Sequence, residues 1–371
     1  MARVVVGMSG GVDSSVAAAL LKEQGYDVVG IMLRLWAEPP AEGAGEGEDA
    51  PVRENACCSI ESPSDARRVA AQLDIPFYVI NVEEPFRETI VDYFYDEYRA
   101  GRTPNPCLRC NRYIRFTLLL ERALALGADY LATGHYVRVD DDPATGQRRL
   151  RRAVDASKDQ SYVLHVLSQH QLRHALFPLG GFTKPEVRAM AAERGLPVAT
   201  KAESQEICFV AANDYRGFVR RYAEAKGQRA PEPGPILDMS GARLGAHTGL
   251  ANYSVGQRKG LGVSAREPLH VLQLDGARNA VIVGPAAALE RDTFTVRQTT
   301  WTRDTPPDGP TPVEIKVRYK APLVRGVVTP LPDGRAEVTL EQPIRAVTPG
   351  QAAVFYGGAA GDEALGGGLI E

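Results

Sequence analysis

GMSGGVDSS, residues 7–15, is the stretch that decides the fold of this chain. It overlaps the end of an apolar run, Arg3–Met8, which predicts a strand, and it opens the helical pattern Asp13–Gln24, which Gly25 ends. Glycines let the backbone approach an oxyanion closely, and a helix N-terminus directs free N–H groups and a positive dipole toward it. The serine hydroxyls add donors, and Asp13 is placed to hold a Mg²⁺ ion that accompanies the phosphates. The stretch predicts a phosphate-binding loop, and a tight turn with a Ser or Asp cap is the plainer alternative.

This loop matches neither of the two common phosphate-binding signatures. It contains no G-x-x-x-x-G-K-[ST] of a Walker loop and no G-x-G-x-x-G of a dinucleotide site. It resembles instead the PP-loop of ATP pyrophosphatases, which cleave ATP between its α and β phosphates and adenylate an oxygen of the substrate. The resemblance of this motif alone implies the superfamily and leaves the substrate open.

Strand and helix patterns alternate over the first two thirds of the chain. Such alternation predicts βαβ units and therefore an α/β fold with a parallel sheet. Residues 37–56, which are rich in Gly, Pro and Glu, are expected to form a mobile loop. Further strands are expected at 28–36, 77–81 and 129–133, and further helices from Ser62 or Ser64 to about Leu73, at 85–100 and at 111–126.

The pattern changes after about residue 205. Residues 227–268 hold many Gly and Pro and few long helical stretches. From about residue 269, short β-branched runs recur near the spacing of antiparallel strands, which predicts a small all-β barrel or sandwich. These runs are 271–274, 281–283, 293–299, 313–319, 324–329, 336–340 and 352–356.

Length and composition set the broad class. A chain of 371 residues is too long for a single hydrophobic core, so two or three domains are expected. The 43 basic and 46 acidic side chains give a net charge of −3, which excludes a uniformly basic protein but leaves room for a local basic face. The start of the chain lacks a signal-peptide layout, and no apolar run reaches the roughly 18 residues that a membrane span needs. We therefore expect a cytoplasmic protein without a membrane partner.

Five cysteines are too few for a disulfide scaffold, so a C-x-x-C indicates metal binding or catalysis. Cys107 and Cys110 form this motif just before a helical pattern, among three arginines. A thiol in that setting is expected to ionise readily. Cys208 lies far away in the sequence. Inert packing and structural zinc stay as alternatives, although zinc would want four ligands and no second C-x-x-C is present. The vicinal pair Cys57-Cys58 is either incidental or functional.

Arginines gather in runs that contain no acidic residue. Tyr98–Leu120 holds five of them, Pro143–Val154 holds four, and Gln257–Gly260 and Lys316–Lys320 add further cations. One such run alone is typical of a solvated face. Several runs in a chain of net charge −3 predict a track for a polyanion, beside which tyrosines such as Tyr319 can stack on bases.

In combination, these pieces are similar to the tRNA-specific 2-thiouridylase family over essentially the whole chain. The resemblance implies an N-terminal PP-loop domain with a Rossmann-like parallel sheet at 1–207, a small central domain at 208–280, and a C-terminal antiparallel β-barrel at 281–371. The matching pieces are GMSGGVDSS (7–15), GRTPNP (101–106), Cys110-Asn111, ATGHY (132–136), KDQSY (158–162), ICF (207–209), GQRKGLG (256–262), TPGQ (348–351) and residues 366–370.

The resemblance also implies an activity. Family members use ATP to adenylate O2 of uridine 34 in the anticodons of tRNAs for Lys, Glu and Gln, and sulfur then replaces that oxygen. Cys208 corresponds to the persulfide carrier and Cys110 to the nucleophile, with a disulfide forming between the two. The implied partners are tRNA and an upstream sulfur donor, either a cysteine desulfurase or a sulfur-relay protein, and the implied state is a monomer.

The family positions carry over to two further sets of residues. The resemblance implies that ATP, with Mg²⁺, contacts Gly7, Met8, Ser9, Gly10, Gly11, Val12, Asp13, Ser14, Leu33 and Gly134. It implies that tRNA contacts Asn105, Pro106, Cys107, His135, Lys158, Asp159, Gln160, Arg318, Tyr319 and Gln351.

One position departs from the family. Many members carry Asp three residues before the catalytic cysteine, where this chain has Cys107. The change puts an Asp-based proton transfer in doubt and makes Cys107, Cys110 and Cys208 candidate ligands of a [4Fe–4S] cluster, because thiolates suit iron–sulfur centres. Two alternatives stay open: a cluster, for which the three thiols must converge within a few ångströms, and a persulfide–disulfide pair without a cluster.

Two rival functions remain at this stage. A PP-loop ligase that amidates a small molecule would share the loop but would need neither Cys110 nor Cys208. A non-catalytic RNA-binding module could be built on the C-terminal barrel, although the intact Ser9–Ser15 loop argues against it.

Overall fold

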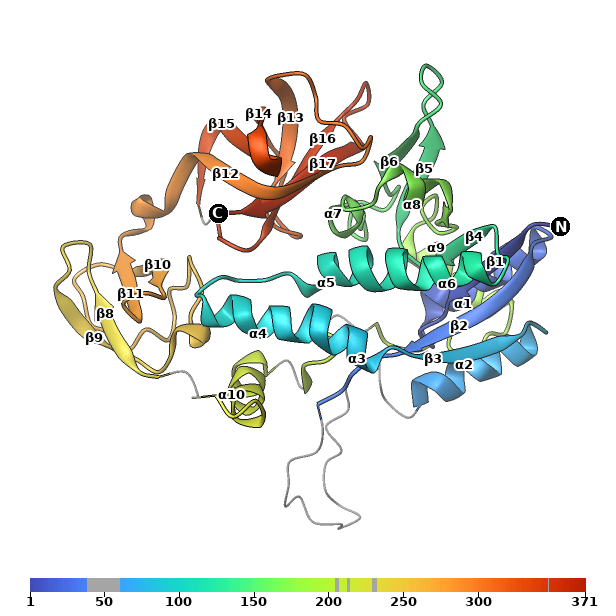
Figure 1. Cartoon of the computed structure of the whole chain (residues 1–371), viewed down its shortest axis with the longest axis horizontal. Coiled ribbons are helices and arrows are strands. Elements are labelled where there is room, and N and C mark those ends of the chain that lie inside the picture. The colour runs from blue at the N-terminus through green and yellow to red at the C-terminus, as the bar shows by residue number, and fades with distance from the viewer. Residues whose placement is uncertain (39–60, 204–206, 212–213, 229–231, 346) are drawn as a thin grey trace, which may run out of the picture.

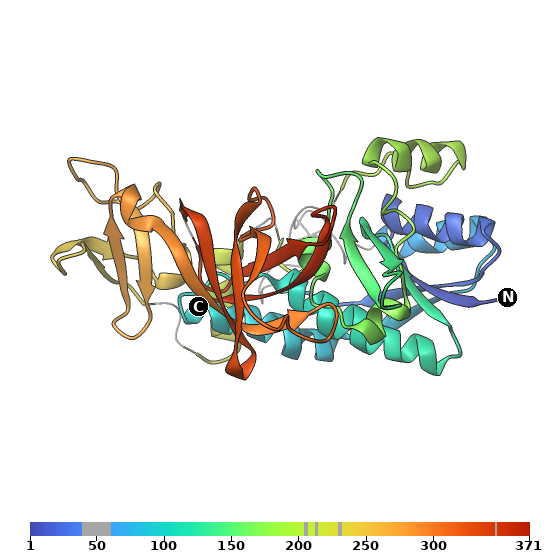
Figure 2. The same cartoon turned by 90° about the horizontal axis from the view of Figure 1, so that it is seen from above.

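The computed structural model describes residues 1–38, 61–203, 207–211, 214–228, 232–345 and 347–371. Residues 39–56 of the expected loop, together with Cys57 and Cys58, lie outside these ranges, as do residues 204–206 just before Cys208. Figure 1 shows an elongated molecule with the N-terminal domain at one end and a small β-domain at the other. Figure 2, turned by 90°, shows the C-terminal barrel lying between them.

The N-terminal domain is built on a five-stranded parallel sheet of order β3-β2-β1-β4-β7. This confirms the predicted α/β class. Because β1 is buried on both sides, its valines alternate between two cores: Val4 and Val6 pack with the helices α1, α2 and α9, and Val5 packs with the long helix that follows Pro106. The strands are β1 (Arg3–Gly7), β2 (Asp27–Arg34), β3 (Phe77–Asn81), β4 (Tyr130–Thr133) and β7 (Ala175–Leu176), and the helices on the first face are α1 (Val12–Glu23), α2 (Glu61–Gln72) and α9 (Lys184–Glu193).

Two long helices run beside each other through the middle of the molecule (Figure 1). The first combines α3 (Glu83–Phe86), a π-helical segment (Arg87–Val91) and α4 (Asp92–Arg99). The second combines α5 (Pro106–Arg109), a π-helical segment (Cys110–Leu119) and α6 (Leu120–Ala125). Both were predicted as helices, but the second begins five residues earlier than expected, because Asn105 caps it and Pro106 occupies its first turn.

The C-terminal strands form a closed barrel, as predicted. Six strands close through the pairing of β12 with β17, and the hairpin β5–β6 of the N-terminal domain extends the same sheet beyond β17. This hairpin was missed, because its strand β6 (Arg148–Arg152) carries the arginines that had suggested an exposed basic run. The other strands of this sheet are β5 (Val137–Asp141), β12 (Glu290–Trp301), β13 (Thr311–Lys316), β14 (Val324–Leu331), β15 (Arg335–Arg345), β16 (Ala352–Gly357) and β17 (Glu363–Ile370).

The central region forms a separate four-stranded sheet of order β10-β11-β8-β9. The runs 271–274 and 281–283, which the sequence had grouped with the barrel, belong instead to this sheet, so that grouping was wrong. They have their own core around Ile236, Val271 and Val283. The strands are β8 (Gly234–Leu237), β9 (Arg243–His247), β10 (His270–Asp275) and β11 (Ala280–Gly284), and the remaining α-helices are α7 (Ser161–Leu164), α8 (Gln169–Arg173) and α10 (Tyr215–Ala225). Within the described residues, no helix has both the length and the apolar character required to cross a membrane.

Candidate active site

The predicted phosphate loop connects β1 to α1 and is held by its own hydroxyls. The Ser14 hydroxyl accepts a hydrogen bond from the Ser9 backbone N–H (3.2 Å), and the Ser14 and Ser15 hydroxyls donate to the Gly11 carbonyl (3.2 and 2.8 Å). Gly10 has a φ of +71°, and a Cβ there would collide with the Ser62 carbonyl of α2. The loop therefore depends on glycine for both its conformation and its contact with α2.

The other expected nucleotide residues lie at the same edge of the sheet. Gly134 follows β4 and lies so close to the start of α1 that a Cβ would be 2.7 Å from both the Asp13 carbonyl carbon and the Ser14 nitrogen. Leu33 lies near the carboxyl end of the neighbouring strand β2. Ligands of open α/β sheets bind at this edge. The structure thus brings Gly7–Ser14, Leu33 and Gly134 to one side of the sheet.

Asp13, the candidate magnesium ligand, is engaged by two residues that sequence reasoning missed. Its Oδ1 accepts hydrogen bonds from the Lys184 ammonium (2.6 Å) and from the Tyr136 hydroxyl (2.7 Å). Burial, together with the charge of Asp13, raises the pKa of Tyr136, so its hydroxyl remains a donor. The motif Thr183-Lys184-Pro185-Glu186 is a capping box, which could have predicted the start of α9 but not its contact with Asp13.

The carboxylate of Glu203 links two lysines beside the loop. Its Oε1 lies 3.1 Å from the Lys184 ammonium, and its Oε2 accepts a hydrogen bond from Lys158 at 2.6 Å. Burial opposes the charge of this carboxylate, but the two lysine contacts outweigh burial and lower the pKa of Glu203. On the far side of the loop, Lys201 donates to the Gly10 carbonyl (3.1 Å) and pairs with Asp65 (2.6 Å). The loop is therefore flanked by cations that are already paired with acids.

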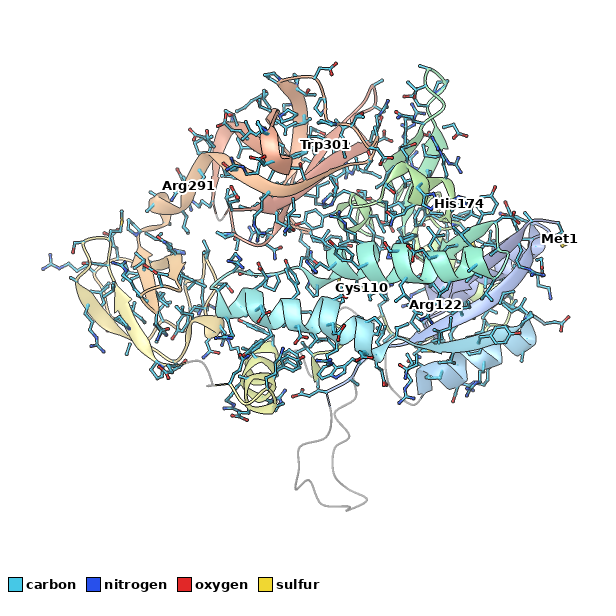
Figure 3. All side chains as sticks on the ribbon, viewed as in Figure 1. Met1, Cys110, Arg122, His174, Arg291 and Trp301 are labelled. Atoms are coloured by element: carbon cyan, nitrogen blue, oxygen red, sulfur yellow. The ribbon has the colours of Figure 1, made fainter. Side chains whose placement is uncertain are left out.

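The C-x-x-C motif opens the second long helix. The Asn105 side chain accepts a hydrogen bond from the Cys107 backbone N–H at 3.1 Å. Cys107 is exposed, whereas Cys110, one turn later, is buried. Figure 3 labels Cys110 on this helix. Cys110 and the partly buried Cys208 pack in the same apolar cluster, which also holds Phe209. The fold therefore brings the two predicted sulfur-handling cysteines into one region despite their separation in the sequence.

The three cysteines do not make a ligand set for a cluster in this structure. Across the ranges that the structure describes, which include Cys107, Cys110 and Cys208, no three His, Cys, Asp or Glu side chains form a group that could hold a metal ion. The predicted convergence of the three thiols is not seen. No step of the chemistry is therefore derived through an iron–sulfur centre.

The arginines near this motif are partly committed to neighbours. Arg109 lies over the rings of Tyr93 (4.2 Å) and Tyr113 (4.9 Å), and Arg102 pairs with buried Glu97 (2.7 Å). These contacts orient the guanidinium groups beside the start of the helix, where they leave less unpaired charge than the sequence suggested.

Six predicted tRNA residues have internal partners: those of Asn105 and Lys158 are given above, and four more follow. His135 is buried between the Thr133 hydroxyl (2.7 Å) and Arg115 (3.3 Å), and burial lowers its pKa to about 3. Asp159 is buried and accepts hydrogen bonds from the backbone N–H groups of Ala153 and Ser161. Gln160 accepts a hydrogen bond from the Tyr136 backbone N–H (2.8 Å), and Gln351 donates one to the Thr103 carbonyl (2.8 Å).

Lys158 pairs with Glu203 beside the phosphate loop, and the other predicted tRNA residues lie around the C-x-x-C motif or on the barrel. Pro106 is buried and Cys107 exposed in the first turn of α5. Arg318 is exposed just after β13. Burial, reinforced by the charge of Asp159, raises the pKa of Tyr319, and its ring centre lies 6.0 Å from that of Tyr162 in the PP-loop domain. The barrel thus contributes side chains beside the PP-loop domain.

The basic run at Arg148–Arg152 is not a free cationic surface. Its four arginines all form ion pairs: Arg148 with Asp141, Arg149 with Asp140, Arg151 with Asp140 and Asp362, and Arg152 with Asp159. Antiparallel pairing places the acids of β5 opposite the arginines of β6. The run therefore stabilises the hairpin, and the predicted polyanion track loses these four charges.

Comparison with protein families gives a consistent result over the chain. Residues 2–212 match the model of the tRNA methyl transferase HUP domain, residues 221–285 that of the tRNA methyl transferase PRC-barrel domain, and residues 291–370 that of the aminomethyltransferase beta-barrel domain.

Similar curated proteins share one description. The tRNA-specific 2-thiouridylase MnmA of Geotalea uraniireducens is 52% identical over 369 residues, covering 100% of this chain and 95% of that protein. The protein of the same name from Heliobacterium modesticaldum is 50% identical over 369 residues, covering 99% and 92%. Among solved structures, the U34-tRNA thiolase NcsA from Methanococcus maripaludis with its [4Fe-4S] cluster aligns at a TM-score of 0.34 and 19% identity, over 61% of this chain and 67% of that one. That likeness is too low to support an inference about this chain.

Proposed function

The chain belongs to the tRNA-specific 2-thiouridylase family and is a tRNA sulfurtransferase, and we propose that it thiolates the wobble uridine U34 of tRNAs for Lys, Glu and Gln. The proposed reaction adenylates O2 of the base with ATP and then replaces that oxygen by sulfur, giving AMP and pyrophosphate. The observation that carries the proposal is the Ser9–Ser15 loop, which the fold places at the carboxyl edge of the parallel sheet against Gly134.

The first step uses this edge of the sheet. The phosphates of ATP bind the loop residues Gly7–Ser14, and the adenosine lies toward Leu33 and Gly134. Asp13 offers a carboxylate of the kind that Mg²⁺ prefers, so it would hold the ion that accompanies the phosphates. The C2 carbonyl of uracil is a poor electrophile, and adenylation converts its oxygen into a good leaving group.

The second step uses the two cysteines that share a core cluster. The terminal sulfur of a Cys208 persulfide attacks C2 of the adenylated base, and AMP leaves with the former O2. The Cys110 thiolate then attacks Sγ of Cys208, which breaks the persulfide S–S bond and leaves the sulfur on the base. A Cys110–Cys208 disulfide forms, and a dithiol reductant resets it.

The anticodon loop is proposed to lie over the C-x-x-C motif, between the PP-loop domain and the barrel. Asn105–Cys107, Lys158 and Arg318-Tyr319 are the residues from which direct contact is expected. His135, Asp159, Gln160 and Gln351 would act through the partners described above. A cysteine desulfurase or a sulfur-relay protein supplies the persulfide, and the enzyme acts as a cytoplasmic monomer. The domain boundary at 207/208 remains a prediction, whereas a boundary at 280/281 would divide β11 of the central sheet.

The test is mass spectrometry of tRNA nucleosides after the protein is incubated with ATP, tRNA and a sulfur source. We expect 2-thiouridine at position 34, with AMP and pyrophosphate in equal amounts. The Cys208→Ser and Cys110→Ser variants should make none, whereas Cys107→Asp should retain activity in air. A Cys208→Ser protein that still makes 2-thiouridine would overturn the sulfur step, and a protein that amidates a small molecule without Cys208 would show the rival ligase chemistry.

A further inference from the structure

Lys184 is a buried cation that lies outside the PP-loop motif and cannot be predicted from it. It is the first residue of α9 and is only 7% exposed. Its ammonium lies 2.6 Å from Asp13 Oδ1 and 3.1 Å from Glu203 Oε1, and it stands 5.7 Å from the centre of the Tyr136 ring. A buried ammonium is expensive unless it is fully paired, so a site that holds one has an electrostatic use for it or a strict structural need.

The charge of the phosphate loop indicates what a buried ammonium could do beside it. A Walker loop carries its own lysine, whereas Ser9–Ser15 contains a single ionisable group, the acidic Asp13. A triphosphate that approaches the N-terminus of α1 therefore meets a carboxylate and needs a cation supplied from elsewhere in the fold. Lys184 is already at that carboxylate, and Glu203 holds the ammonium from its other side.

We propose that Lys184 is the cation of the nucleotide site: on ATP binding its ammonium contacts the phosphate oxygens, and Asp13 turns to the accompanying magnesium ion. Glu203 is the positioning residue that keeps the ammonium at the loop when its contact with Asp13 is lost. The inference rests on the proposed use of ATP, but it concerns nucleotide binding alone and needs neither tRNA nor sulfur.

The test compares the affinities of the full chain for Mg·ATP and for adenosine, by calorimetry without tRNA. A charged hydrogen bond to phosphate contributes roughly 1.5–3 kcal/mol, so Lys184→Met should weaken ATP binding by about thirtyfold. Adenosine, which has no phosphate, should bind within about twofold of wild type. Lys184→Arg should recover part of the ATP affinity, because it restores the charge with a different shape.

Arg188→Met is the matched control. Arg188 lies one turn later on the same helix and faces the same carboxylate, with Glu203 Oε1 at 3.9 Å. Its guanidinium donates to the Ala199 and Lys201 carbonyls, and within the described residues it makes no bond to the loop. Its ATP affinity should stay within about twofold of wild type. If Lys184→Met fails to fold, Lys184→Gln keeps donors for both carboxylates without the charge and carries the same expectation.

Two results would overturn the inference. A folded Lys184→Met or Lys184→Gln protein with wild-type ATP affinity shows that the ammonium is only structural, and so does an equal loss of ATP and adenosine affinity. Failure of the proposed function is a different result, namely a wild-type protein that binds no ATP or makes no 2-thiouridine.

Discussion

Replacing Gly134 by alanine adds one methyl group at a close backbone contact of the candidate nucleotide site. Gly134 is not in the left-handed region, so its backbone would accept a side chain. The obstacle is space, because the new Cβ would lie 2.7 Å from the Asp13 carbonyl carbon and the Ser14 nitrogen. Both neighbours are backbone atoms at the start of α1 and cannot rotate away as a flexible side chain would.

The size of the effect follows from this distance. An ordinary contact begins at 3.4 Å, so β4 and the start of α1 must separate by about 0.7 Å. Overpacking of this kind costs typically about 1–3 kcal/mol in folding free energy. A displacement of about 1 Å at reacting groups can lower turnover on the order of 10²-fold, so we expect a loss approaching that size in ATP-dependent pyrophosphate release.

The assay measures urea unfolding, ATP affinity and pyrophosphate release for Gly134→Ala beside Gly181→Ala. Gly181 has open space around its would-be Cβ, so its variant should stay within about 0.5 kcal/mol of wild type and keep full activity. A Gly134→Ala protein with wild-type ATP affinity and turnover would refute the packing argument. An equal loss in Gly181→Ala would show that glycine replacement is harmful here for another reason.

Three further predictions concern protonation, charge and the contact between the barrel and the segment before the C-x-x-C motif. Burial lowers the pKa of His135 to about 3, so below pH 6.5 this residue is protonated in the unfolded state but not in the folded state. The free energy of unfolding should therefore fall by up to about 2 kcal/mol, from this residue, between pH 6.5 and pH 5. His135→Gln should show a smaller fall in urea titrations at the two pH values. Arg318→Met should reduce the slope of log tRNA affinity against log salt concentration by about one unit. Arg151→Met loses its ion pairs with Asp140 and Asp362, so it should lower stability and leave that slope unchanged. Equal slopes for both variants would contradict the proposed contact of Arg318 with tRNA. Gln351→Ala removes the bond to the Thr103 carbonyl and should cost about 1 kcal/mol in unfolding free energy, while Gln351→Glu, which cannot donate, should cost no less.

The fold was largely readable because its local signals agree with its packing. The strand at 77–81 has the bounds that its apolar pattern gave, and α1 differs from its prediction by one residue at each end. The hairpin β5–β6 was missed because arginines in a strand look like a solvated run until the acids opposite them are known. Long-range pairing also places β11 beside β8 as a parallel neighbour, and no local sequence pattern predicts this contact.

The site was readable only in the parts that one segment supplies. Gly10 and Asp13 belong to a contiguous motif, so their loop follows from its sequence. Lys184 and Glu203 reach it from elements far along the chain, and a lysine in a capping box looks like any surface lysine. The sequence left an iron–sulfur cluster and a cysteine pair open as alternatives for a related reason, because a C-x-x-C motif fixes two thiols on one helix but not which side of that helix is buried.

The loop is acidic, and the lysine that pairs with Asp13 comes from a distant part of the sequence. A Walker loop carries its phosphate-binding lysine in its own segment, whereas here α9 packs against α1 and brings Lys184 to Asp13. Glu203, five residues before Cys208, holds that lysine and also holds Lys158 of the segment expected at the tRNA. Two ammonium groups at one carboxylate repel each other, so the hold on one depends on how close the other lies. If Lys184 has the proposed role, a nucleotide that shifts its ammonium would change how firmly Glu203 holds Lys158. Linkage would then require that tRNA at Lys158 change the hold on Lys184 by the same free energy.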